Sequence, residues 1–231
     1  MPARAHPDVI FFDVGGTLLN FSVEPSELFS RILASHGVNV APSVLYKTMR
    51  EVEAQFPLPL GISAASEGAY WRAYDDQILE ATRVPRVPGL LDEIQRRFRE
   101  ELTLDCFPES AEVLEALARR GIPLGVISNA SHGILGDLDR NGIRRFFEHV
   151  IYSQSVGVAK PDAKIFREAL ARFRVAPDRA WHVGDNVEAD IVGARAVGIR
   201  PILVDRGFGR DPQGAAVVRD LRGVLTLLAE A

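Results

Sequence analysis

A short apolar run that ends in an aspartate constrains the fold of this chain more than any other feature. Residues 9–12 read Val-Ile-Phe-Phe, and the sequence Asp-Val-Gly-Gly-Thr follows from Asp13 to Thr17. An apolar run of this length between turn-forming residues is typical of a buried parallel strand. Open α/β sheets bind ligands at the carboxyl ends of such strands, so Asp13 is a candidate nucleophile or metal ligand. An aspartate that only opens a turn would suit the same position.

The chain changes its pattern near residue 105. Residues 21–104 show helical periodicity and no predicted strand, whereas strands and helices alternate after residue 108, which favours a doubly wound parallel sheet. We therefore expect an α/β, Rossmann-like core formed by residues 1–20 and 105–231, with residues 21–104 inserted as an α-helical bundle. Helices are predicted at 25–36, 42–56, 67–81, 90–101, 109–120, 133–140, 162–173, 190–197 and 217–228, later strands at 122–127, 147–152, 180–183 and 201–204, and a proline-rich break at 57–61.

Composition and charge limit the classes of partner. The chain has 231 residues, 47% hydrophobic and 25% charged, which is ordinary for a globular protein of this size. A net charge of −4 gives no electrostatic reason to bind nucleic acid or an anionic membrane. No apolar run approaches the roughly 18 residues of a membrane span, and the single cysteine, Cys106, has no partner within the chain for a disulfide. We expect a cytoplasmic protein, monomeric or homodimeric.

Four polar side chains are expected at one edge of the predicted sheet. Asp13, Ser128 and Asp185 end predicted strands, and Lys160 lies in a loop on the same side. Two carboxylates that meet in a crevice repel each other unless a cation or proton lies between them, and Mg²⁺ prefers oxygen ligands. Lys160, the Ser128 hydroxyl and backbone N–H groups of the glycine turn could hold the oxygens of a phosphoryl group. The pattern thus predicts a Mg²⁺ site beside a phosphoryl-binding site.

These residues lie in four segments that together resemble the haloacid dehalogenase-like hydrolase superfamily. The segments follow the family's order along the α/β part of the chain and are far more specific jointly than singly. They are Asp13-Val-Gly-Gly-Thr17-Leu18, Ile127-Ser128-Asn129, Val158-Ala-Lys160-Pro161 and Gly184-Asp185-Asn186-Val-Glu-Ala-Asp190. The inserted helices resemble the family's cap, which closes over the site and selects the substrate.

The resemblance implies a Mg²⁺-dependent phosphatase that acts on a small phosphorylated metabolite, and it implies a role for each matched residue. Asp13 would attack phosphorus to form an aspartyl-phosphate, and Lys160 would neutralise the charge of the nucleophile and the phosphate. The phosphoryl group would be contacted by Ser128, Asn129 and Gly16. Mg²⁺ would be bound by Asp13, Asp185 and the carbonyl of Gly15. These groups would be oriented by Asp190 and Thr17, which would touch neither the metal nor the substrate. His182, close to the fourth segment, is expected to be a hydrogen-bonded structural residue.

The chain departs from the family's phosphatases at Gly15. They usually carry a second aspartate there, which protonates the leaving group and then activates water. Glycine does neither, and general acid–base catalysis is typically worth about 10²–10⁴-fold, so we expect slow turnover of ordinary phosphate monoesters.

Three alternatives follow from the missing aspartate. The chain could be a weakened relative that binds a phosphorylated ligand or a partner without turnover. It could resemble the dehalogenases, which use only the first aspartate, although they carry a bulkier residue at this position and need no Mg²⁺. It could also resemble the phosphonate-cleaving enzymes, in which a cap lysine, here Lys47, forms a Schiff base; an exposed helical lysine is the plainer interpretation of Lys47.

Overall fold

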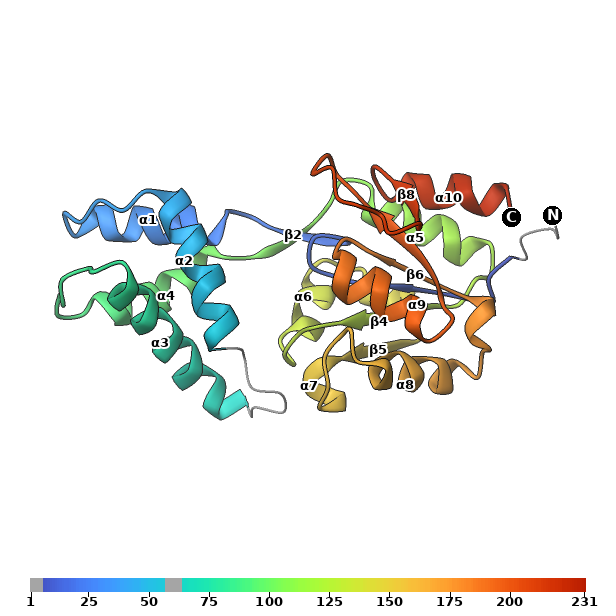
Figure 1. The fold of residues 1–231 in the computed structure, drawn as a ribbon, viewed down its shortest axis with the longest axis horizontal. Helices are drawn as coiled ribbons and strands as arrows, with labels where there is room; N and C mark the ends of the chain where they lie inside the picture. Colours follow the sequence, from blue (N-terminus) through green and yellow to red (C-terminus); the bar gives the residue numbers. More distant parts are fainter. Residues whose placement is uncertain (1–5, 57–63) are drawn as a thin grey trace. The chain divides into compact units, whose positions relative to one another are not determined.

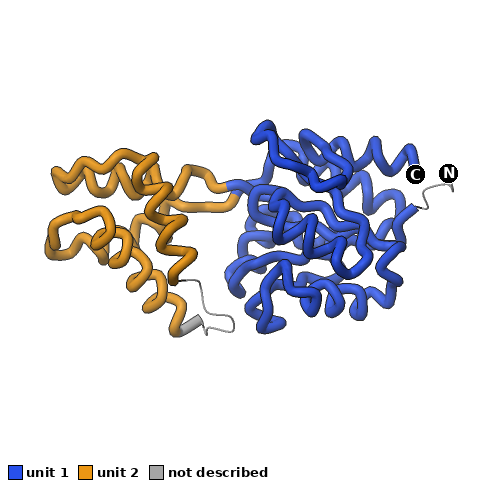
Figure 2. Tube along the Cα trace, in the orientation of Figure 1, with its two compact units in different colours: residues 1–20, 105–231 blue, residues 21–104 orange. Residues whose placement is uncertain are grey.

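The computed structural model of the chain describes residues 6–56 and 64–231 (Figure 1). The chain divides into two compact units, which Figure 2 distinguishes by colour. Met1–Asn20 and Asp105–Ala231 form one, called here the α/β unit, and Phe21–Leu104 form the other, called the helical unit. The proline-rich break predicted at 57–61 lies outside the described residues.

A six-stranded sheet is the centre of the α/β unit (Figure 1). Its strand order is β5-β4-β1-β6-β7-β8, and every neighbouring pair is parallel, which confirms the predicted α/β fold. All four residues of β1 are fully buried, as expected for a central strand covered on both faces. The strands are β1 Val9–Phe12, β4 Leu124–Ser128, β5 His149–Tyr152, β6 Ala180–Gly184, β7 Arg200–Val204 and β8 Ala216–Val218.

The register of the three central strands brings their carboxyl ends together. Phe12, the last residue of β1, lies opposite Val126 in β4 and Val183 in β6. Chain connections leave β1 toward β4 and later return to β6 on its other side, so β1 is a topological switch point of the sheet. Ligands of open α/β sheets bind at such points, and the residues that follow these three strands therefore face one crevice.

Helices cover both faces of the sheet. An apolar cluster joins Phe11 and Ile127 of the sheet to Phe166 of α8 and Ala194 of α9 on one face. Because crossover connections are right-handed, α5 and α6, which lead into β4 and β5, cover the other face. The helices are α5 Ser110–Arg119, α6 Ile134–Arg140, α7 Ser153–Val156, α8 Ala163–Phe173, α9 Gly193–Ala196 and α10 Arg222–Ala229, with the 3₁₀ turns Arg144–Phe146 and Pro177–Arg179 and the π-helix Val187–Val192.

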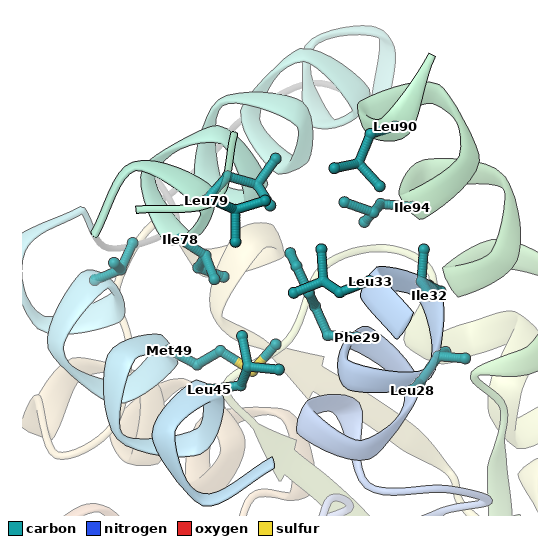
Figure 3. Close-up of a cluster of buried hydrophobic side chains, with 12 residues drawn as sticks. Leu28, Phe29, Ile32, Leu33, Leu45, Met49, Ile78, Leu79, Leu90 and Ile94 are labelled. Carbon is teal, nitrogen blue, oxygen red and sulfur yellow. The ribbon is translucent and has the colours of Figure 1, made fainter. Parts of the chain in front are cut away.

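The helical unit is a bundle of α1 Pro25–Ser35, α2 Pro42–Gln55, α3 Ala64–Ala81 and α4 Leu90–Glu101. Pro25 and Pro42 stand at the first turns of their helices, where a missing N–H costs nothing. Gly37, at a φ of +77°, follows α1 in the left-handed conformation that ends many helices. All four helices contribute side chains to one buried apolar cluster, including Phe29, Leu45, Ile78 and Ile94 (Figure 3).

The sequence-based assignment was wrong at three short strands. Residues 217–228 were expected to form one helix, but β8 pairs with β7 and α10 begins only at Arg222. The strands β2 Leu19–Phe21 and β3 Leu104–Cys106 pair with each other, although no strand was predicted there. Three residues are too few to show a period, so their pairing partners decide the conformation. None of the helices in the described part of the chain is long and apolar enough to span a bilayer.

Candidate active site

The turn after β1 holds Asp13 at the crevice. The Asp13 N–H donates to the carbonyl of Val183 in β6 (2.9 Å), and the carbonyl of Val14 accepts from the N–H groups of Thr17, Leu18 and Leu19. Gly16 has a φ of +77°, and a Cβ atom there would lie 2.7 Å from Asp185 Oδ2. Only glycine therefore allows this turn to approach Asp185. The Gly16 N–H donates to the carbonyl of Leu19 (2.8 Å), and the phosphate contact expected of Gly16 stays a prediction.

Lys160 is the centre of a buried charge network. Its ammonium donates to Asp13 Oδ1 (2.7 Å), to Asp190 Oδ1 (2.5 Å) and to the carbonyl of Ile127 at the end of β4 (2.8 Å). The Lys160 side chain is 2% exposed, so it is not a surface lysine. Three acceptors around one ammonium fix its position, and they place a positive charge directly against Asp13.

Asp190 lies in the π-helix that follows β6. Its Oδ2 atom accepts from the N–H of Asn186 (3.0 Å), and Oδ1 accepts from Lys160 and from Nε2 of His182 (2.9 Å). A Cβ atom on Gly184 would lie 2.2 Å from Cγ of Asp190, so this glycine provides the space for the carboxylate. Asp190 is fully buried, and its contacts exceed those of an aspartate that only compensates a helix dipole.

The two predicted phosphate-binding residues at the end of β4 are Ser128 and Asn129. Ser128 ends β4 and is 4% exposed. The side chain of Asn129 binds the backbone of Lys160 at both ends, since Nδ2 donates to the Lys160 carbonyl (3.0 Å) and Oδ1 accepts from the Lys160 N–H (2.7 Å). This pair of bonds ties the loop before α8 to the end of β4.

Electrostatics explain how the network keeps its charges. Although burial disfavours the ammonium, Asp13 and Asp190 raise the pKa of Lys160. Although burial also disfavours its carboxylate, Lys160 and the hydrogen bond from His182 hold the pKa of Asp190 well below its usual range. Burial raises the pKa of Asp13, with Lys160 opposing the shift. The arrangement thus favours a protonated Lys160 and an ionised Asp190.

A divalent cation fits beside this network. Carboxylate oxygens of Asp13, Asp185 and Asp190 lie within 4.8 Å of one another. Both oxygens of Asp190 already accept hydrogen bonds, which leaves Asp13 and Asp185 as the better ligands. Burial, together with the charges of Asp13 and Asp190, raises the pKa of Asp185 to about 6. A bound cation would offset this repulsion between the carboxylates. An all-oxygen donor set suits a hard ion such as Mg²⁺.

Two arginines that the sequence analysis missed border the site. Arg210 Nη1 donates to the backbone carbonyl of Asp185 (2.8 Å) and lies 3.3 Å from its Oδ2 atom. Arg206 donates to the carbonyl of Thr17 (3.0 Å) and forms an ion pair with Glu109 (2.8 Å). A signal was present, because the glycine- and arginine-rich segment of residues 205–210 directly follows β7 at the carboxyl edge of the sheet.

Three further positions singled out in the sequence are Gly15, Thr17 and Lys47. A Cβ atom on Gly15 would meet no heavy atom within 4 Å among the described residues, so the site has room for a side chain there. Thr17 is fully buried, with Oγ1 3.5 Å from Asp185 Oδ1. Lys47, in α2, is 79% exposed and lies 3.8 Å from Glu51 one turn later, which is an ordinary surface ion pair.

Comparisons with known proteins identify the family to which this chain is similar. The family model of haloacid dehalogenase-like hydrolases matches residues 7–198. Haloacid dehalogenase-like hydrolase domain-containing protein 3 of Mus musculus is 31% identical over 94% of this chain and 88% of its own length. A phosphoserine phosphatase of Thermus thermophilus is 40% identical over 58% of this chain and 55% of its own length. The crystal structure of a HAD phosphatase from Thermococcus onnurineus shares the fold, with a TM-score of 0.68 and 21% identity over 96% of this chain and 98% of that chain.

Proposed function

Because the chain belongs to the haloacid dehalogenase-like hydrolase family, we propose that it is a Mg²⁺-dependent phosphatase of a small phosphorylated metabolite. The observation that carries this proposal is the buried ammonium of Lys160, bound at once to Asp13 and Asp190, with Asp185 beside them. A cation against a buried carboxylate is what a nucleophile needs when it attacks an anionic phosphoryl group. The 40% identity to a phosphoserine phosphatase supports the same class of reaction.

In the first step Asp13 acts as the nucleophile. Its Oδ1 atom is held by Lys160, so Oδ2 forms the new bond to phosphorus while the bond from phosphorus to the leaving oxygen breaks. Lys160 stays protonated and offsets the charge that gathers on the phosphoryl oxygens, and the Ser128 hydroxyl at the end of β4 donates to one of them. In the second step water attacks phosphorus, which releases phosphate and restores the Asp13 carboxylate.

Mg²⁺ would be held by Asp13, Asp185 and the backbone carbonyl of Gly15, and it would supply a positive charge that polarises the phosphoryl group. Thr17 and Arg210 contact Asp185 and would orient its carboxylate. The contacts of Asn129 and Gly16 also give each residue a structural role. Asn129 fixes the backbone of Lys160, and Gly16 provides space for Asp185.

Gly15 sets the expected speed of the reaction. It supplies no carboxyl group to protonate the leaving oxygen or to activate water, so phosphate monoesters with poor leaving groups should react slowly. Acyl phosphates, whose leaving group needs no proton, should suffer least in the first step. Hydrolysis of the aspartyl-phosphate is then the slow step. We assign the choice of substrate to the helical unit, residues 21–104, as a cap.

The proposal is tested by a phosphatase screen in the presence of Mg²⁺. Wild type and Asp13→Asn are compared on p-nitrophenyl phosphate, acetyl phosphate and a panel of phosphorylated metabolites. We expect turnover by the wild type, fastest on acetyl phosphate, and none by Asp13→Asn, whose folding is checked by circular dichroism. Equal activity of the two proteins would remove Asp13 from the mechanism.

The glycine at position 15 favours a second candidate, a protein that binds a phosphorylated ligand without turning it over. The Gly15→Asp variant separates the two, because the structure has room for that side chain. A silent wild type with an active Gly15→Asp variant would mean an intact scaffold that serves in binding. Turnover by the wild type that Asp13→Asn abolishes would reject the binding candidate.

A further inference from the structure

His182 occupies an unusual position beneath the catalytic network. It lies in β6, is fully buried, and is two residues before Gly184, so both positions face the same side of the strand. On that side the ring of Phe166 meets the His182 ring edge-on, at 5.4 Å between centroids. His182 and Gly184 together accommodate the side chain of Asp190: the glycine leaves space for the carboxylate, and the histidine binds it.

The hydrogen bond to Asp190 fixes the proton on the imidazole ring. Nε2 of His182 lies 2.9 Å from Asp190 Oδ1, which also accepts from Lys160. An ionised carboxylate only accepts hydrogen bonds, so Nε2 carries the hydrogen. Nδ1 is buried and has no hydrogen-bond partner among the residues that the structure describes.

A buried nitrogen without a partner is a cost that packing alone does not explain. Leucine or phenylalanine would fill the same space beside Phe166 without an unpaired polar atom, and buried polar groups in folded proteins are nearly always hydrogen-bonded. The benefit that offsets this cost is the bond at the other nitrogen. That bond ends on the oxygen that holds Lys160.

We infer that His182 is a positioning residue of the reaction, acting on Lys160 through Asp190. By donating to Oδ1 it shares the negative charge of Asp190, so that the ammonium of Lys160 is not drawn away from Asp13. Without this donor, Lys160 is the sole partner of Oδ1 and shifts toward it. Nucleophilic attack is then less well supported, while substrate binding is little changed. The effect on the rate of Asp13 phosphorylation rests on the proposed phosphatase function.

The test compares His182→Leu with His182→Gln, two side chains of similar size of which only glutamine donates a hydrogen bond. We expect the rate at which acetyl phosphate phosphorylates Asp13, measured by rapid quench before the steady state, to fall by about 10–100-fold in His182→Leu, as for other lost supporting bonds, with the affinity for acetyl phosphate little changed. His182→Gln should recover most of this rate. Wild type and Asp13→Asn are assayed in parallel, so that failure of the proposed function is recognised by their equal activity.

A second readout does not depend on activity. In ¹⁵N NMR spectra the wild type should show a protonated Nε2 and an unprotonated Nδ1 at His182, and a slowly exchanging ammonium signal from Lys160. That ammonium signal should shift or broaden in His182→Leu and persist in His182→Gln.

Either of two results would overturn the inference: a folded His182→Leu with the wild-type rate of Asp13 phosphorylation and an unchanged Lys160 signal, or equal impairment of the leucine and glutamine variants. If His182→Leu fails to fold, His182→Phe takes its place, because the phenyl ring fills the space of the imidazole.

Discussion

Two buried aspartates, one in each unit, show how differently the two parts of the chain treat charge. Asp190 in the α/β unit and Asp75 in the helical unit are both almost fully buried. The partners of Asp190 include Lys160 and His182, and they hold its pKa well below the usual range. Burial raises the pKa of Asp75 to about 7, and the hydrogen bond from the neutral amide of Gln95 offsets little of that shift.

This difference between the two aspartates indicates that the α/β unit, rather than the helical unit, is suited to hold a charged catalytic site. Burial is common to both units, so burial alone does not make a site; the ammonium of Lys160 and the hydrogen bond from His182 let the α/β unit keep an ionised Asp190 carboxylate in its interior. The helical unit is instead built around apolar side chains from four helices (Figure 3), and its buried Asp75 has no cationic partner among the described contacts that hold it. Four predictions test this comparison.

The largest effect is expected from Lys160→Met. This change leaves Asp13 and Asp190 buried without their shared cation, and breaking a buried ion pair in this way typically costs about 3–5 kcal/mol. Urea denaturation should show this loss, and phosphatase activity should disappear. Lys164→Met, four residues away on an exposed position, is the matched control and should leave both unchanged. Equal stability of the two variants would contradict the buried network.

Asp75→Asn should change the free energy of unfolding by a slightly smaller amount and in the opposite direction, which means that it should stabilise the protein. In the unfolded chain Asp75 ionises near pH 4, whereas in the folded chain it ionises near pH 7, so its contribution to stability falls as the pH rises from 4 to 7 and is constant above. Asparagine removes this penalty. We expect a gain that approaches about 4 kcal/mol at pH 8 and vanishes near pH 4, with 1.36 kcal/mol for each pKa unit.

Denaturation of wild type and Asp75→Asn at both pH values checks this sign. A gain that is the same at pH 4 and pH 8 would mean that the titration of Asp75 is not its cause.

A pair of glycine substitutions gives intermediate effects. Alanine at Gly184 would place a Cβ atom 2.2 Å from Cγ of Asp190, and such overpacking typically costs about 1–3 kcal/mol. Alanine at Gly68, an exposed position in α3 with nothing within 4 Å among the described residues, should stabilise the helix by about 0.5–1 kcal/mol. Thermal denaturation of both variants measures the contrast. If Gly184→Ala is as stable as the wild type, the space between residue 184 and the Asp190 carboxylate is larger than described.

The smallest effect is expected from Lys47→Ala. Its ion pair with Glu51 is exposed, and such pairs contribute about 0–1 kcal/mol. Neither stability nor phosphatase turnover should change measurably. The phosphonate-cleaving hypothesis predicts the reverse for a phosphonate substrate, since Schiff-base chemistry needs this amine; loss of phosphonate cleavage in Lys47→Ala would establish that hypothesis.

The sequence was sufficient for the features that depend on strand direction and period. Buried apolar runs that end in polar residues predicted the parallel sheet, and parallel strands place their carboxyl ends at one edge, which is why Asp13, Ser128 and Asp185 could be grouped. The four long helices of the helical unit were predicted because they extend over enough residues to show a period.

Features that depend on particular partners were not accessible from the sequence. β8 has only three residues and owes its conformation to pairing with β7. The contacts of Arg210 with Asp185, and of Asn129 with the backbone of Lys160, join segments that lie 25 and 31 residues apart. The position of residues 205–210 after β7 could have placed Arg210 at this edge of the sheet, but no local pattern encodes either contact itself, since both exist only once the sheet has brought the segments together.

The most direct test of the central claim is a search for the phosphorylated form of Asp13. The wild type is mixed with acetyl phosphate and Mg²⁺, quenched in acid, and its peptides are analysed by mass spectrometry. Because Gly15 offers no carboxylate to activate water, the aspartyl-phosphate should accumulate on the peptide that contains Asp13, and it should be absent from Asp13→Asn and short-lived in Gly15→Asp. Turnover without a phosphorylated Asp13, or a phosphoryl group on another residue, would contradict the account.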